Sequence, residues 1–110
     1  MVAETVELTV RRYLRAARKA GIHARRAVLF GSYARGLQDE WSDIDLIVIA
    51  PELDGTPDRN LIAKLWELRA STDSRIEPIA CGEREWLADG SRPILEIARR
   101  EGIVIDDPEQ

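Results

Sequence analysis

Apolar residues recur at two spacings along the chain, and each spacing predicts one kind of element. From residue 5 to residue 20 they recur every three or four positions, as one side of a helix requires. Gly21 follows as an expected C-terminal cap. The same spacing predicts a helix from residue 59 or 60 to residue 70. Shorter helices are expected over residues 83–88 and from Pro93 to about residue 100, with a helical turn over residues 33–37.

Short unbroken apolar runs predict strands. They cover residues 27–30, 43 or 44 to 50, and 75–80, and the run at 103–105 is a candidate for a fourth. The second run is apolar on both faces from Leu46 onward, which is typical of a central strand covered on two sides. Pro78 lacks an N–H group, so the third run is expected at a sheet edge or a bulge.

The order of these elements predicts the fold class. Three or four strands alternating with helices favour an α+β fold (mixed α/β), with a small three- to four-stranded mixed sheet and flanking helices. A length of 110 residues suits one domain spanning residues 1–110. The polar tail, residues 106–110, is expected to fray.

Composition excludes several classes of protein. The chain has 16 Lys and Arg against 20 Asp and Glu, a net charge of −4, which disfavours non-specific binding to nucleic acid. Cys81 is the only cysteine and His23 the only histidine, so a disulfide, a His-rich metal centre and a Ser-His-Asp triad are all disfavoured. No apolar run approaches the roughly 20 residues that span a bilayer, and the N-terminus lacks the pattern of a secretory signal. A cytoplasmic protein is expected.

A Gly-Ser pair directly after the first strand is a candidate phosphate site. Gly31 allows a sharp turn and close approach of an anion, and Ser32 adds a hydroxyl and a backbone N–H. The helical turn that follows directs further N–H groups to the same place. Arg35 could pair with phosphate oxygens, although a surface arginine is an equal alternative.

Two aspartates at the start of the second strand are candidate metal ligands. Asp43 and Asp45 are two residues apart, so they project from one face of a strand while Ile44 turns toward the core. Paired carboxylates repel each other, and a hard cation such as Mg²⁺ resolves the repulsion. Glu77 is the acid within the third strand and is the candidate third carboxylate, as metal ligand or as general base. Its alternative is an outward-facing residue on an edge strand.

Other surface features have plain alternatives. The basic side of the first helix is interpreted as a face exposed to solvent. The alternative is that it forms a docking surface for an acidic partner or for phosphate. Most of the tryptophans are expected in the core, with docking again the alternative. The residues concerned are Arg11, Arg12, Arg15, Arg18 and Lys19 of the helix, and Trp41, Trp66 and Trp86.

In combination these residues resemble a known signature. Gly31-Ser32, ten residues and then Asp43-Ile44-Asp45 is similar to the signature of the DNA polymerase beta-like nucleotidyltransferase superfamily. GSYARG with SDIDLIV resembles the minimal nucleotidyltransferases, over roughly residues 28–49 and more loosely at RIEPI and EIARREGIVI. The resemblance implies the polymerase beta-like fold, a triphosphate held by Gly31 and Ser32, Mg²⁺ (two ions) bound by the aspartates, and a third acid at Glu77. That acid is most often Asp in the superfamily.

The resemblance also implies a partner. Relatives this small are commonly antitoxins of HEPN-type RNase toxins, in some cases by transferring AMP from ATP to a toxin tyrosine. A binding module that neutralises its partner by occlusion alone, and a small-molecule (antibiotic) nucleotidyltransferase, are the alternatives. Homo- or hetero-oligomers are compatible with either.

Overall fold

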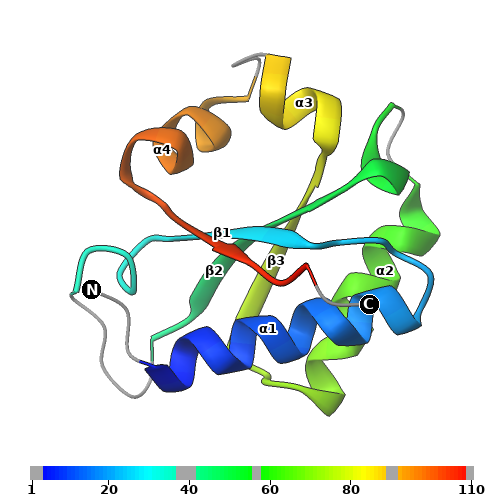
Figure 1. Ribbon diagram of the computed structural model, residues 1–110, viewed down its shortest axis with the longest axis horizontal. Helices are drawn as coiled ribbons and strands as arrows, with labels where there is room; N and C mark the ends of the chain where they lie inside the picture. The colour runs from blue at the N-terminus through cyan, green and yellow to red at the C-terminus, as the bar shows by residue number, and fades with distance from the viewer. Residues whose placement is uncertain (1–3, 37–41, 56–57, 89–91, 109–110) are drawn as a thin grey trace.

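The computed structural model describes residues 4–36, 42–55, 58–88 and 92–108. Its centre is one four-stranded sheet with helices on both faces (Figure 1). The strands are β1 (Arg26–Phe30), β2 (Ile44–Ala50), β3 (Ile76–Gly82) and β4 (Ile103–Asp106). The helices are α1 (Glu4–Lys19), α2 (Arg59–Glu67), α3 (Glu83–Ala88) and α4 (Pro93–Glu101), with short 3₁₀ segments η1 (Pro51–Leu53) and η2 (Leu68–Ser71).

The sheet is mixed, in the order β3-β2-β1-β4. β1 pairs antiparallel with both β2 and β4, whereas β2 and β3 are parallel. The predicted α+β class is therefore confirmed, and the run at residues 103–105 is a strand. β2 is an interior strand, as its apolar residues on both faces predicted. β3 is an edge strand, which is the position that Pro78 requires.

Alternate residues of the strands feed two separate cores. Leu46 and Val48 of β2 pack into the larger core beneath α1 and α2. Ile47 and Ile49 belong to the smaller core, which α4 and α3 cover. Figure 1 shows α1 and α2 below the sheet and α3 and α4 above it. The alternation follows from the period of two along a strand, and it fixes which side chains share the face of Asp45.

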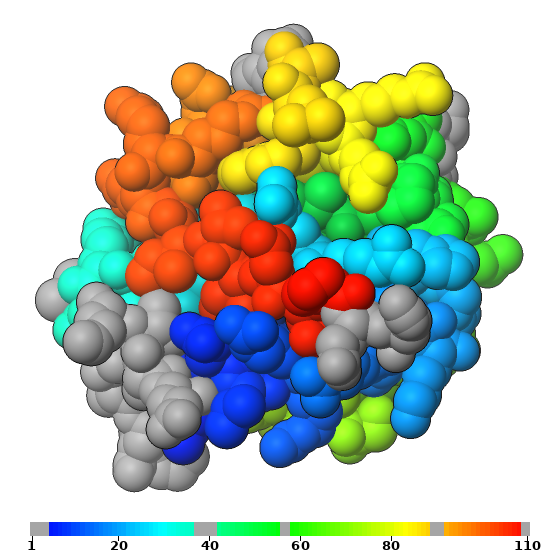
Figure 2. All heavy atoms as spheres, in the orientation of Figure 1, coloured from blue at the N-terminus to red at the C-terminus, as the bar shows by residue number. Residues whose placement is uncertain are grey.

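The chain after β4 corrects one expectation. The prediction that residues 106–110 fray is wrong for Asp106 and Asp107. Asp106 ends β4 and pairs with Arg26, while Asp107 is only 2% exposed and accepts hydrogen bonds from Arg15 and Arg18 of α1. In Figure 2, β4 lies between α1 and α3 on this face of the molecule. A buried carboxylate is retained here because two guanidinium groups compensate it.

Two further details differ from the sequence predictions. Trp66 is 40% exposed, not in the core, with the Arg69 guanidinium 4.7 Å from its ring centroid. Trp86 is half-buried beside the smaller core, and Trp41 lies outside the described residues. The basic side of α1 is not simply solvated, since Arg15 and Arg18 bind Asp107. None of the described helices has the length and apolar character of a membrane span.

Candidate active site

The turn after β1 packs directly onto Asp45. Gly31 has φ +76°, a conformation that L side chains rarely adopt, and a Cβ there would lie 2.3 Å from Asp45 Oδ2. The Arg35 N–H donates to the Gly31 carbonyl oxygen at 3.2 Å, and the turn ends at Gly36, with φ +72°. The helical turn predicted over residues 33–37 is found as a hydrogen-bonded turn that covers residues 31–36. Leu37 lies outside the described residues. Glycine is required at position 31 because the aspartate occupies the space of a side chain.

The strand pairing brings the turn and two of the acids together. Asp45 of β2 is paired on one side with Phe30, the last residue of β1. On its other side it is paired with Glu77 of β3. Directly paired residues of adjacent strands present their side chains on the same face. Asp43 immediately precedes β2 and is exposed, while Asp45 and Glu77 are half-buried. Parallel pairing of β2 with β3 is what places Glu77 beside the aspartates.

The electrostatics of Asp45 reflect this crowding. Burial raises the pKa of Asp45, and the neighbouring negative charges of Glu77 and Asp43 raise it further. The surroundings of Asp45 therefore disfavour its ionised form. A cation among the three carboxylates would reverse that effect.

The donor set suits a hard divalent cation. Carboxylate oxygens are the ligands that Mg²⁺ prefers, and Asp43, Asp45 and Glu77 supply only such atoms. As the side chains stand, no three Asp, Glu, His or Cys residues within the described ranges converge as a ready-made metal site. Asp43 is exposed, so its side chain can turn toward Asp45 without disturbing the core. The residues fit Mg²⁺ by chemistry and by strand position.

Three residues that the sequence did not single out connect the parts of this site. Arg75 Nη1 donates to the Tyr33 hydroxyl at 2.8 Å, and its other guanidinium nitrogens donate to the Asp73 carboxylate. The Arg75 carbonyl accepts the N–H of Ile44 at 2.8 Å. Tyr33 is buried under the turn. The one sequence signal was the Asp-x-Arg spacing, in which Asp73 also accepts the Arg75 backbone N–H.

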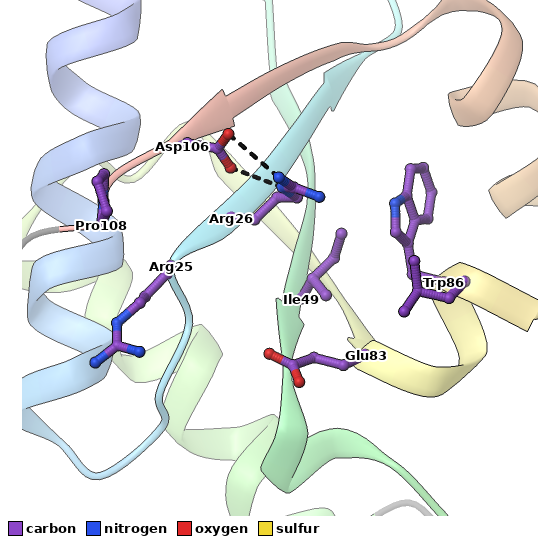
Figure 3. A pocket seen from close by; sticks show the side chains of 8 residues that line it. Arg25, Arg26, Ile49, Glu83, Trp86, Asp106 and Pro108 are labelled. Carbon is purple, nitrogen blue, oxygen red and sulfur yellow. Dashed lines mark hydrogen bonds and ion pairs between the residues drawn. The ribbon is translucent and has the colours of Figure 1, made fainter.

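The remaining predicted residues lie on the same turn. Ser32 is half-buried beside Gly31, and Arg35 is exposed. A cavity of about 430 Å³ lies elsewhere, at the far end of the sheet, and is lined by Arg26, Ile49 and Trp86 among others (Figure 3). The Arg26–Asp106 ion pair lies beside it. None of the three acids lines this cavity, so it is separate from the candidate active site.

A mixed sheet with a Gly-Ser turn packed on an aspartate, and a second acid on the adjacent strand, suits the class of domains that transfer groups at phosphorus. The family model described as "Nucleotidyltransferase domain" matches residues 10–80, and the chain belongs to that family. The predicted resemblance is confirmed at this level. The matched residues include the turn, both aspartates and Glu77.

Individual relatives agree with the family. A protein of Methanocaldococcus jannaschii named "Putative protein adenylyltransferase MJ0141" is 42% identical over 40 residues, which are 36% of this chain and 40% of that protein. The match thus spans well under half the length of that relative. Among solved structures, a toxin-antitoxin crystallised with AMP-PNP superposes with a TM-score of 0.63 at 23% identity, covering 94% of this chain and 75% of that one. A mutant of the toxin-antitoxin MntA-HpeT gives 0.59 at 20% identity, covering the same shares. These two likenesses establish a shared fold.

Proposed function

We propose that this protein transfers AMP from ATP to a hydroxyl group, a tyrosine of a HEPN-type RNase toxin, and thereby acts as its antitoxin. The observation that carries the proposal is the register of Asp45 with Glu77, with the Gly31 turn packed on the same aspartate. A triphosphate on the turn would lie next to the carboxylates. That is the arrangement that transfer at phosphorus needs.

In this proposal one set of residues binds the nucleotide and another binds the metal. Gly31 and Ser32 hold the triphosphate through backbone N–H groups, and Arg35 pairs with a phosphate oxygen. Asp43, Asp45 and Glu77 would hold Mg²⁺ (two ions), which would neutralise phosphate charge during the displacement.

The transfer itself is one displacement at phosphorus. The tyrosine oxygen attacks the α-phosphorus, the bond to the β-phosphate breaks and pyrophosphate leaves. The tyrosine proton passes to Glu77 or to water.

A protein acceptor agrees with the shape of the site. Asp43 is exposed and the other two acids are half-buried, so the carboxylates lie at the molecular surface, where a partner can present a side chain. The solved toxin-antitoxin neighbours and the relative named as an adenylyltransferase support the same choice. A cytoplasmic location follows from such a partner.

Mass spectrometry tests the proposal. The purified chain, ATP, Mg²⁺ and a HEPN-type RNase toxin are expected to give a toxin heavier by one AMP, on tyrosine. Asp45→Asn is expected to abolish transfer while leaving the melting temperature unchanged or slightly higher, because the charge it removes is disfavoured in the fold. Asp106→Asn, an exposed acid at the far end of the sheet, is the matched control and is expected to transfer normally.

The outcomes separate the alternatives. No adduct with the wild-type protein would contradict the proposal. If Asp45→Asn still neutralises the toxin fully, neutralisation works by occlusion and the chemistry is dispensable. Label from ATP appearing in an aminoglycoside instead would indicate a small-molecule enzyme.

A further inference from the structure

We infer that Arg75 is a positioning residue of the candidate active site. Its contact with the Tyr33 hydroxyl fixes the turn of residues 31–36, here called the phosphate turn, relative to the three carboxylates of the site. This inference rests on the proposed function for its catalytic meaning. The contact itself is a feature of the fold and can be tested separately.

One residue connects every part of the site. The side chain of Arg75 donates to Tyr33, which directly follows Ser32 in the turn. Its carbonyl oxygen accepts the N–H of Ile44, the residue between the two aspartates. Glu77 lies two positions further along the same chain segment, at the start of β3. Arg75 therefore contacts the turn and the strand start that carries the aspartates, and it lies two residues before Glu77.

The geometry keeps the guanidinium group in one place. Nε donates to Asp73 Oδ1 at 3.0 Å and Nη2 to Asp73 Oδ2 at 2.8 Å, so the planar group is held on two points. The third nitrogen, Nη1, is thereby directed at Tyr33. The hydrogen bond from Arg75 lowers the pKa of Asp73, which keeps the pair ionised at neutral pH.

This arrangement assigns Arg75 to positioning and not to phosphate binding. Its charge is already paired with Asp73, and its Nη1 is engaged by a tyrosine whose ring is buried in the larger core. A turn that is already ordered before ATP binds loses less entropy on binding, so loosening the turn is expected to weaken ATP binding. The hydrogen bond from Arg75 to Tyr33 ties this turn to the residue that directly precedes β3.

Steady-state kinetics with the toxin partner test the inference. Tyr33→Phe keeps the buried ring and removes only the acceptor, so it is expected to raise KM for ATP by roughly tenfold with kcat within about twofold. Arg75→Lys cannot make the three-point contact, so it is expected to lower kcat as well. The double variant is expected to be no worse than Arg75→Lys, because both changes break the same bond. Arg26→Lys, which alters an Arg–Asp pair remote from the acids, is the matched control with wild-type kinetics.

Amide hydrogen exchange separates this inference from the proposed function, because it needs no nucleotide. The Arg35 amide, which donates to Gly31, is expected to exchange at least fivefold faster in Tyr33→Phe and Arg75→Lys, and at the wild-type rate in Arg26→Lys. Unchanged exchange at Arg35, or additive kinetic losses in the double variant, would overturn the positioning role. If the wild-type protein transfers nothing, the proposed function fails, and the exchange result still decides whether this bond holds the turn.

Discussion

Gly31 and Asp45 show how a single missing side chain builds a site. The Asp45 carboxyl fills the space beside Gly31, so a carboxyl whose pKa is raised packs directly against the turn of residues 31–36. Gly36 has nearly the same φ, but among the described residues, its chain neighbours aside, no atom lies within 4 Å of where its Cβ would be. Comparing substitutions at the two glycines therefore separates two contributions to the free energy of unfolding. One comes from the backbone conformation, and the other comes from the contact with Asp45.

Substituting these glycines gives the first prediction. Gly36→Ala is expected to lower the free energy of unfolding by about 1 kcal/mol, the cost of a left-handed conformation. Gly31→Ala carries that cost and must also displace Asp45, roughly 2–3 kcal/mol in all. Urea denaturation of the two variants measures the difference. Equal losses would show that Asp45 moves aside freely and that the close packing is not needed.

At the scale of elements, helix starts depend on carboxylates. Asp58 caps α2 by accepting the N–H groups of Asn60 and Leu61. Asp54, in the loop after β2, accepts the N–H groups of Arg84 and Glu85 in the first turn of α3, and it sits where a side chain at Gly82 would be. The loop after the aspartate-bearing strand is thus tied to the helix that follows the Glu77-bearing strand.

The cap of α2 gives the second prediction. Asp58→Ala is expected to lower the free energy of unfolding by about 1 kcal/mol, because two N–H groups lose their acceptor. Asp58→Asn keeps an acceptor oxygen and is expected to lose much less. Thermal denaturation followed by circular dichroism compares the two. If Asp58→Asn lowers stability as much as Asp58→Ala, then the negative charge of Asp58, and not its hydrogen bonds, stabilises the start of α2.

At the scale of the whole molecule, Asp107 joins the last strand to the first helix. Arg15 Nε and Arg18 Nη2 donate to its carboxylate at 2.9 and 2.8 Å, and its N–H donates to Arg25. Burial alone would raise the pKa of Asp107, but the hydrogen bonds from Arg18 and Arg15 outweigh it and lower the pKa. This contact holds α1 against β4 across the edge of the sheet.

Acid unfolding gives the third prediction. Because the folded pKa of Asp107 lies below its unfolded value of about 3.9, the contact contributes its full stability above that pH and loses it as pH falls through the folded pKa. Asp107→Asn is expected to cost roughly 3 kcal/mol at pH 7, since Arg18 is left buried beside a neutral group. Its stability is also expected to fall less steeply below pH 4 than that of the wild type, as measured by urea denaturation across pH.

The control for that prediction is an exposed ion pair. Asp106→Asn removes a carboxylate whose partner Arg26 is also exposed, and it is expected to change stability by less than about 1 kcal/mol at any pH. Equal pH profiles for the two variants would contradict the assignment to Asp107.

Patterns within short segments were predictable, and long-range pairings were not. β2 was predictable because its apolar run is long. Asp43 precedes β2, so the prediction that it shares a strand face with Asp45 stays a prediction. The burial of Asp107 was missed because its partners Arg15 and Arg18 lie far away in sequence, where a polar tail gives no sign of them. The neighbouring position of Glu77 depends on parallel pairing with β2, and Arg75 acts through Tyr33, so neither could be read from local pattern.

Pro78 has a consequence for how this molecule meets others. It lies next to Glu77 on the edge strand β3, where a residue without an N–H leaves a gap in the row of donors along the open rim. A foreign strand cannot continue the ladder across that gap, which guards against edge-to-edge aggregation. The rim beside Glu77 is therefore less able to pair with the backbone of another chain, and a molecule that approaches it there meets side chains first.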